Sequence, residues 1–188
     1  MDKPGKKSLL SFCKNVELAS ASYISPFSRV YESSLGFHTS VGWFCQIQNC
    51  RIGEGVAIAS HCSLGAINHL YNLPVLRFSP RSFGRPSPTT IIGSDVWIGS
   101  HCTIMAGVTI GTGAIIACNS FVNTDVGDYE VYGGTPAKFI KKRFSNDITE
   151  RLLQIQPWTK DDNYLIEVLS RDLSMDEYLK ILESDNEK

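Results

Sequence analysis

Residues 92–127 read IGSDVW, IGSHCT, IMAGVT, IGTGAI, IACNSF and VNTDVG, which are consecutive blocks of six residues. An aliphatic residue opens every block, and the fifth position is always small or of modest size. A period of six fits neither the 3.6-residue period of an α-helix nor the two-residue alternation of a simple β-strand. It fits a β-solenoid whose coils have short flat sides, and in which stacking buries the first positions in continuous columns.

The same rhythm continues upstream with spacings of five or six residues, and it is interrupted once, from Gly65 to Thr90. The upstream first positions are Ile24, Val30, Leu35, Val41, Ile47, Ile52, Ile58 and Leu64. Burial of one such side chain contributes roughly 1.5–3 kcal/mol, so the columns can stabilise a solenoid without a two-layer core. We expect an N-terminal lead-in at 1–23, an all-β solenoid at 24–143 with an extended loop at 65–90, and a helical tail at 144–188.

The fourth position of each block is expected to turn a corner of the coil. A tight corner often needs a positive φ, which Gly adopts freely and which Asn, Asp and His tolerate better than most residues. His38, His61 and His101 all occupy this position, and we interpret them as corner residues. A metal site is the alternative, but no partner ligands follow at zinc spacing. The fourth positions in the regular half are Asp95, His101, Gly107, Gly113, Asn119 and Asp125.

Composition excludes several classes of protein. The net charge of −1 argues against a broad surface for nucleic acid or for anionic membranes. No apolar run is long enough to cross a bilayer, and the N-terminus lacks the pattern of a secretory signal, so we expect a cytoplasmic chain. The six cysteines form no CxxC pair and are expected to be free thiols. Cys45, Cys62 and Cys102 occupy fifth positions and are predicted to be small buried hydrophobes.

The interruption at 65–90 contains His69, the one histidine that lies outside the six-residue pattern. Long loops that project from a rigid scaffold commonly carry binding and catalytic groups. A solvated loop histidine is the alternative. The pattern therefore makes His69 a candidate for chemistry that the flat sides of a solenoid cannot provide.

Two stretches resemble a known family. IIGSDVWIGSHCTIMAGVTIGTGAIIACNSFVNTDV, followed by VYGGTPAKFIKKRF, is similar to the hexapeptide-repeat acyltransferases, and most similar to their xenobiotic (chloramphenicol and streptogramin) acetyltransferase branch. That branch has an Asn-His pair in an extended loop, here Asn68-His69, a VWIG block, here 96–99, and a GxPAK segment, here 134–138. The resemblance implies a left-handed parallel β-helix, a homotrimer with active sites between subunits, acetyl-CoA as co-substrate and no metal.

The resemblance also implies roles for individual residues. Acetyl transfer needs a base for the acceptor proton and a site that holds CoA, and a histidine titrates in the useful range. By analogy His69 is the general base, oriented by a backbone carbonyl or a nearby acid. A basic stretch, Lys138 with 141–143, could neutralise the phosphates of CoA. The residues carried over as CoA-binding are Trp97, Ser100, Cys118, Pro136, Lys138 and Lys141.

The expected activity is acetyl transfer from acetyl-CoA to a hydroxyl of a small sugar, polyol or antibiotic. N-acetylation of an amino sugar, free or linked to a nucleotide, is the near alternative, because the same base and donor serve both. Two remoter alternatives use the same scaffold: a zinc carbonic anhydrase of the γ class, which needs three converging histidines, and a non-catalytic solenoid. The sequence does not identify the acceptor.

Residues after Phe144 have a helical pattern. Ser145 or Asn146 can cap a first helix, which Pro157 ends. A second helix is marked by an apolar stripe at 165–169, and a third begins at the capping box of Ser174 and Glu177. The last seven residues, 182–188, are expected to fray.

Overall fold

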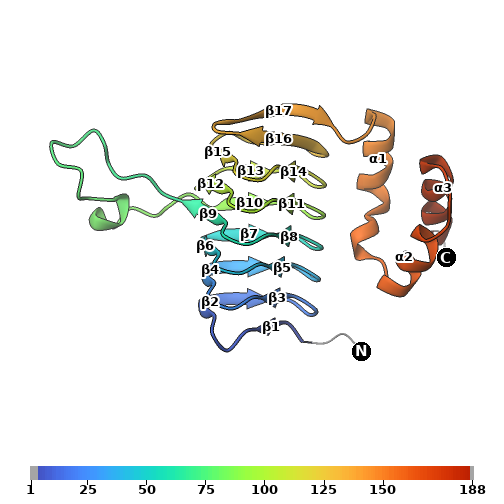
Figure 1. Ribbon diagram of the computed structural model, residues 1–188, viewed down its shortest axis with the longest axis horizontal. Coiled ribbons are helices and arrows are strands. Elements are labelled where there is room, and N and C mark those ends of the chain that lie inside the picture. Colours follow the sequence, from blue (N-terminus) through green and yellow to red (C-terminus); the bar gives the residue numbers. More distant parts are fainter. Residues whose placement is uncertain (1–3, 187–188) are drawn as a thin grey trace. The chain divides into compact units, whose positions relative to one another are not determined.

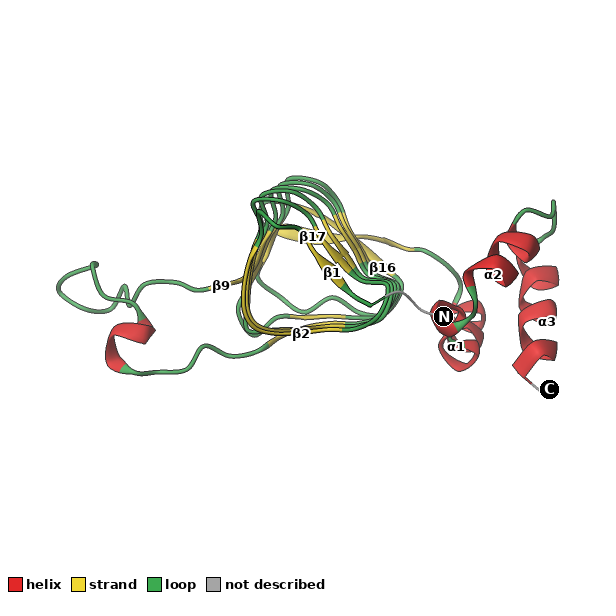
Figure 2. Cartoon of the chain, turned by 90° about the horizontal axis from the view of Figure 1, so that it is seen from below, coloured by secondary structure: helices red, strands yellow, loops and turns green. Residues whose placement is uncertain are grey.

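The computed structural model describes residues 4–186, apart from the side chains of Arg81, Ser82 and Asn186. The chain forms two compact units that divide after Arg143. The first unit is a parallel β-solenoid (Figure 1), and its strands superpose in a triangle in the end-on view (Figure 2). The six-residue pattern therefore predicted the fold class correctly, because each block forms one side of the triangle.

Each coil passes through three faces. The first face contains β1 (Lys6–Lys7), β3 (Tyr23–Ile24), β5 (Ser40–Val41), β8 (Ala57–Ile58), β11 (Trp97–Ile98), β14 (Ile115–Ile116) and β16 (Glu130–Gly134), with β17 (Ala137–Lys142) antiparallel to β16. The second contains β6 (Gln46–Gln48), β9 (Ser63–Ala66), β12 (Thr103–Met105) and β15 (Phe121–Val122), and the third contains β7 (Cys50–Ile52), β10 (Thr90–Ile92) and β13 (Thr109–Ile110). The strands β2 (Phe12–Leu18) and β4 (Arg29–Leu35) continue from the second face into the third.

The predicted first positions form the core. Parallel registers stack them in columns, such as Ile24, Val41, Ile58, Ile98 and Ile116 on the first face. All fourteen predicted first positions between 24 and 122 are at most 4% exposed. Apolar burial along these columns is thus continuous from coil to coil, as the periodicity predicts.

The corners confirm most of the conformational prediction. The first corner joins the first face to the second, the second corner joins the second face to the third, and the third corner closes the coil. His38, His61, His101 and Asn119 have φ between 55° and 63°, and Asp95, Gly107 and Gly113 are also positive. Asp125 is the exception, since its φ is not positive. Its carboxylate instead accepts a hydrogen bond from the Thr109 N–H at 2.8 Å, which supports the corner through a side chain.

Small side chains fill the inside of the corners. At the first corner Cys45, Cys62 and Cys102 are at most 2% exposed, and each thiol donates to a carbonyl of the next coil at 3.1–3.2 Å. Burial raises the pKa of the Cys50 thiol, at the second corner, to about 12. All six cysteines are free thiols. The predicted buried role of the three fifth-position cysteines is confirmed.

The solenoid begins before Ile24, which corrects the expected lead-in at 1–23. The strands β1 and β2 pair in parallel with β3 and β4 and so belong to the first coil. Cys13, Val16 and Leu18 take the inward places but are only partly buried. An end coil has a neighbour on one side only, so its sequence needs fewer aliphatic residues and the six-residue period fades there.

The extended loop leaves the solenoid at the second corner, between β9 and β10, and projects outward in both views (Figures 1 and 2). It contains a short 3-10 helix, η1 (Pro80–Phe83). Gly65 lies where the chain turns outward, with φ +74°, and a Cβ there would lie 2.0 Å from the carbonyl oxygen of Gln48. The exit of the loop therefore requires glycine at this position.

We expect Gly65→Ala to lower the free energy of unfolding by about 1–3 kcal/mol, because the side chain adds backbone strain and a clash with a fixed carbonyl. Gly84→Ala is the matched control, since Gly84 has φ +65° but a Cβ there would meet no atom within 4 Å. Denaturant melts of both variants separate strain from clash. Equal losses in the two variants would show that the Gln48 carbonyl yields and that the exit is not constrained.

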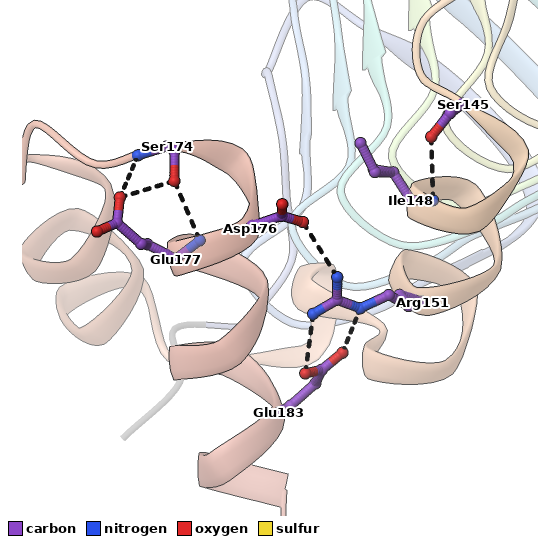
Figure 3. Close-up of polar contacts among 7 residues, drawn as sticks. All are labelled: Ser145, Ile148, Arg151, Ser174, Asp176, Glu177 and Glu183. Atoms are coloured by element: carbon purple, nitrogen blue, oxygen red, sulfur yellow. Dashed lines mark hydrogen bonds and ion pairs between the residues drawn. The ribbon is translucent and has the colours of Figure 1, made fainter.

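The second unit is a group of helices, α1 (Asn146–Ile155), α2 (Asp162–Leu169) and α3 (Met175–Asn186), with a 3-10 turn, η2 (Pro157–Thr159). Ser145 caps α1, and Ser174 and Glu177 form the predicted capping box of α3 (Figure 3). Arg151 on α1 makes a two-bond ion pair with Glu183 on α3, at 2.7 and 3.0 Å. The three predicted helices and the predicted caps of the first and third are confirmed.

The fraying expected at 182–188 is wrong for most of that segment. The helix α3 continues to Asn186, with Leu182 buried and Glu183 held by Arg151. The last two residues, 187 and 188, lie outside the described part of the chain. None of the helices within residues 4–186 combines the length and hydrophobicity that a bilayer-spanning segment requires.

Candidate active site

The ring of His69 is held by the loop itself. Its Nδ1 lies 2.5 Å from the carbonyl oxygen of Leu76, and the side chain is exposed. A carbonyl oxygen can only accept, so this hydrogen bond requires the proton to be on Nδ1. The lone pair is then on Nε2, which faces away from the bond and is able to accept a proton. Of the two possibilities that the sequence left open for the orienting group, the structure contains the backbone carbonyl.

The far end of the loop is tied to the solenoid by one side chain. The Asn49 Nδ2 donates to the carbonyl of Ser87 at 2.7 Å, and the Thr89 hydroxyl donates to Asn49 Oδ1 at 3.3 Å. Asn49 is a second-corner residue one turn below the loop, with φ 48°. It therefore fixes the direction in which the chain returns to β10. Sequence reasoning missed this role because Asn49 looks like an ordinary corner residue.

The residues carried over as CoA-binding lie on a different part of the triangle. Ser100 and Cys118 are in line along the first corner, where the Asn119 N–H donates to the Ser100 carbonyl at 2.9 Å. The turn that contains Pro136 is tied to the same corner, because the Thr135 hydroxyl donates to the Asn119 carbonyl at 3.1 Å. Three of the six residues thus form a row parallel to the solenoid axis.

The other three lie on the first face. Trp97 is 52% exposed, as expected for an outward position, and it heads a column in which Trp97, Ile115, Val131 and Lys141 are register partners. Lys138 pairs with Gly133 at the turn end of β17. The structure brings all six residues to the first face and the first corner, with the exposed indole beside the row and two exposed lysines above it.

One member of the expected basic stretch is used differently. Arg143 makes an ion pair with Asp95 at 3.2 Å, donates to the Gly113 carbonyl, and lies over the ring of Tyr129 at 5.2 Å. It therefore fastens the end of the solenoid to the third corner. Lys138, Lys141 and Lys142 are exposed, and the first two are the residues carried over as CoA-binding.

Within one chain, the candidate base and the candidate CoA surface are separated. The loop with His69 leaves the second corner and extends outward, whereas the six other residues lie on the first face and first corner (Figure 2). Asn49 also ties the returning end of the loop to the second corner. The family resemblance implies that His69 and the CoA-binding residues share one site. Within a single chain they lie on different parts of the solenoid.

The histidines of the corners do not converge on a metal. His61 and His101 stack with their ring centroids 4.7 Å apart, in line with Phe44, whereas His38 lies at the third corner beside Phe37. Nowhere in residues 4–186 do three His, Cys, Asp or Glu side chains lie close enough to hold one metal ion. The arrangement gives no support to the carbonic anhydrase alternative, which needs three histidines at one point.

A polar hollow of about 320 Å³ lies at the root of the loop. Every residue of its lining except Cys50 is polar, and the lining includes Asn15, Glu17, Glu32, Ser34, Arg51 and Thr89. These residues come from the first three coils and from the returning end of the loop, and sequence reasoning did not single them out. Their signal was a spacing of 17 residues, one coil, from Glu17 through Ser34 to Arg51.

Comparisons with known sequences find a hexapeptide-repeat transferase family and named acetyltransferases. The bacterial transferase hexapeptide (six repeats) family matches residues 89–124. A probable macrolide acetyltransferase from Lysinibacillus sphaericus is 38% identical over 144 residues, which cover 69% of this chain and 78% of that protein. A chloramphenicol acetyltransferase from Agrobacterium fabrum is 39% identical over 117 residues, which cover 58% of this chain and 56% of that protein.

Solved structures share the fold. A variant of AntD, an N-acyltransferase from Bacillus cereus solved with dTDP-4-amino-4,6-dideoxyglucose and coenzyme A, matches with a TM-score of 0.65 at 18% identity, over 82% of this chain and 90% of that one. An acetyltransferase from Vibrio cholerae that contains hexapeptide repeats matches with a TM-score of 0.53 at 24% identity, over 72% and 74%. At these identities the likeness shows the fold alone.

Proposed function

Because the chain belongs to the hexapeptide-repeat acetyltransferases of the xenobiotic branch, a family of left-handed parallel β-helices, we propose that it transfers an acetyl group from acetyl-CoA to a hydroxyl of a small sugar, polyol or antibiotic in the cytoplasm. The observation that carries the proposal is the ring of His69, whose Nδ1 is bonded to the Leu76 carbonyl and whose Nε2 is left as a base. Two relatives with named acetyltransferase activity support it.

In the proposed mechanism His69 Nε2 removes the proton of the acceptor hydroxyl as the oxygen attacks. The thioester of acetyl-CoA supplies an activated acyl group, so no acyl-enzyme is needed. The Leu76 carbonyl keeps the imidazole in the required tautomer and stabilises the imidazolium that forms. The imidazolium then returns its proton to the departing thiolate of CoA, so that the histidine is ready for the next cycle.

The side chains of the proposed CoA surface match the chemical groups of CoA. Lys138 and Lys141 are exposed and can pair with phosphate groups, and the half-exposed indole of Trp97 gives an apolar wall for a pantetheine arm. Gly99 lets two coils stack closely at the first corner, since a Cβ there would lie 2.7 Å from the backbone nitrogen of Cys118.

We further propose that the active site lies between subunits of a homotrimer. The second corner of one chain carries the base, and the first corner of a neighbour carries CoA. The separation of the two sets on one chain supports this arrangement, since the loop leaves at one corner of the triangle and the CoA residues lie at another. Cyclic symmetry then gives three equivalent sites.

The function is tested by a screen for CoA thiol release from acetyl-CoA with hydroxylated antibiotics, polyols, sugars and amino sugars as acceptors. Turnover with at least one hydroxyl acceptor, and an O-acetyl product by mass spectrometry, are the expected results. A product acetylated only on nitrogen would replace the proposal with the alternative of an N-acetyltransferase. Hydrolysis no faster than in buffer for every acceptor would contradict acetyl transfer itself.

Cys118 reports on the CoA surface directly. Its thiol is exposed, whereas Cys45, Cys50, Cys62 and Cys102 are buried, so we expect iodoacetamide to modify Cys118 before those four. Saturating CoA, added as acetyl-CoA so that no free thiol consumes the reagent, is expected to slow that modification by about fivefold or more, read by peptide mass spectrometry. Cys13, which is partly exposed on the first coil, is the internal control and is expected to keep its rate. Equal rates at Cys118 with and without CoA would move the CoA site elsewhere.

A further inference from the structure

The hollow at the root of the loop has a defined geometry. Glu17, Ser34 and Arg51 are register partners on three successive coils of the third face. Neighbouring strands lie about 4.8 Å apart, so Glu17 and Arg51 are about 10 Å apart along the solenoid. Glu32 lies at the second corner beside this column, and Thr89 closes the upper edge. The hollow is therefore lined by two carboxylates, one guanidinium and, from the returning end of the loop, Thr89.

The charged side chains of the hollow do not stabilise the fold through polar contacts. Glu17, Glu32 and Arg51 are exposed, and within residues 4–186 their side chains make no hydrogen bond or ion pair with one another or with neighbours. Asn49 differs, since its amide holds the loop. The two carboxylates outnumber the single guanidinium, so the hollow has a net negative charge. A ligand with a positive charge and several hydroxyls matches these groups better than a neutral apolar one does.

We propose that this hollow binds the amine-bearing sugar ring of the acceptor, with the cationic amine at Glu17 and Glu32 and ring hydroxyls at Arg51 and Ser34. That the bound sugar is an acetyl acceptor rests on the proposed function. Binding of a cationic sugar in the hollow does not depend on it. A volume of about 320 Å³ is at the lower end for ligand pockets and suits one sugar ring rather than a whole antibiotic.

The site is tested by binding, with two probes that differ in one group. Methyl glucoside is neutral, and the methyl glycoside of N,N-dimethylglucosamine has a protonated tertiary amine that cannot itself be acetylated. Ligand-observed NMR titrations of the full chain are expected to give at least about tenfold tighter binding for the cationic probe. The double variant Glu17→Gln/Glu32→Gln is expected to reduce that preference to less than about twofold.

Glu54→Gln is the matched control, because Glu54 is on the same coil as Arg51 but at the third corner, outside the hollow. It is expected to keep the full preference. Equal binding of the two probes, no binding of either, or a preference that survives the double variant would each overturn the inference.

Acetyl transfer is measured in parallel, so that the two proposals fail separately. Transfer to hydroxyl acceptors without a preference for cationic ones would remove the inference and leave the proposed function. A cation preference in binding, lost in the double variant, with no acetyl transfer to any acceptor would remove the proposed function and leave the hollow as a site for cationic sugars.

Discussion

Replacing His69 with alanine is expected to lower kcat for acetyl transfer by about 10²–10⁴-fold, the range in which a positioned general base contributes. The loss follows from the geometry of the loop. The bond from Nδ1 to the Leu76 carbonyl fixes the tautomer with a free Nε2, and alanine removes the group that accepts the acceptor proton. The affinity for acetyl-CoA is expected to stay unchanged, since the substitution alters none of the six residues of the candidate CoA surface. Thiol-release kinetics give kcat, and titration calorimetry gives the affinity.

Asn72→Ala is the matched control for His69→Ala, because Asn72 is an exposed polar residue three positions further along the same loop. It is expected to retain wild-type turnover within about twofold. A His69→Ala variant that is folded and remains within about threefold of wild-type kcat would mean that the histidine is a solvated loop residue. The base would then have to be sought on another part of the molecule.

The core could be predicted from the sequence because each core position has a local requirement for one type of side chain. A column such as Ile98 beneath Ile116 needs one aliphatic side chain per coil, and the six-residue period records that need directly. The period fails where the requirement changes. At β2 the end coil has one open side, and Val16 is enough although it is only partly buried. At Asp125 a side-chain hydrogen bond supports the corner without a positive φ.

The candidate site could be predicted from the sequence only in part. His69 could be singled out because it breaks a strict pattern, but its partner is the backbone carbonyl of Leu76, and a backbone group has no signature in a sequence. The hollow is a different case. Glu17, Ser34 and Arg51 become neighbours through a parallel register of 17 residues, which can be calculated once the coil length is known. Outward positions vary freely in a solenoid, so their periodicity indicates a site only after the inward columns have set the register.

Mixing two inactive variants is expected to restore activity, because the base and the CoA surface of one site belong to different chains. One variant is His69→Ala, with an intact first corner. The other is Trp97→Ala/Lys138→Glu, with an intact loop but a damaged CoA surface, assayed at a low concentration of acetyl-CoA. In a cyclic trimer that contains both variants, one interface of the three joins the intact corner of the first to the intact loop of the second. Tandem purification through two different tags isolates these mixed trimers, and their activity is expected to be about one third of wild type.

This outcome separates the two possible arrangements of the site by a wide margin. If base and CoA surface worked together within one chain, neither variant would possess a complete pair, and the mixture would stay at the activity of its parents. A preparation in which both tags are attached to His69→Ala controls for the effect of the tags and is expected to remain inactive. Recovery to about one third in the mixed trimers, with no recovery in this control, requires His69 of one chain to act on acetyl-CoA held by another, and it follows from the exit of the loop at the second corner.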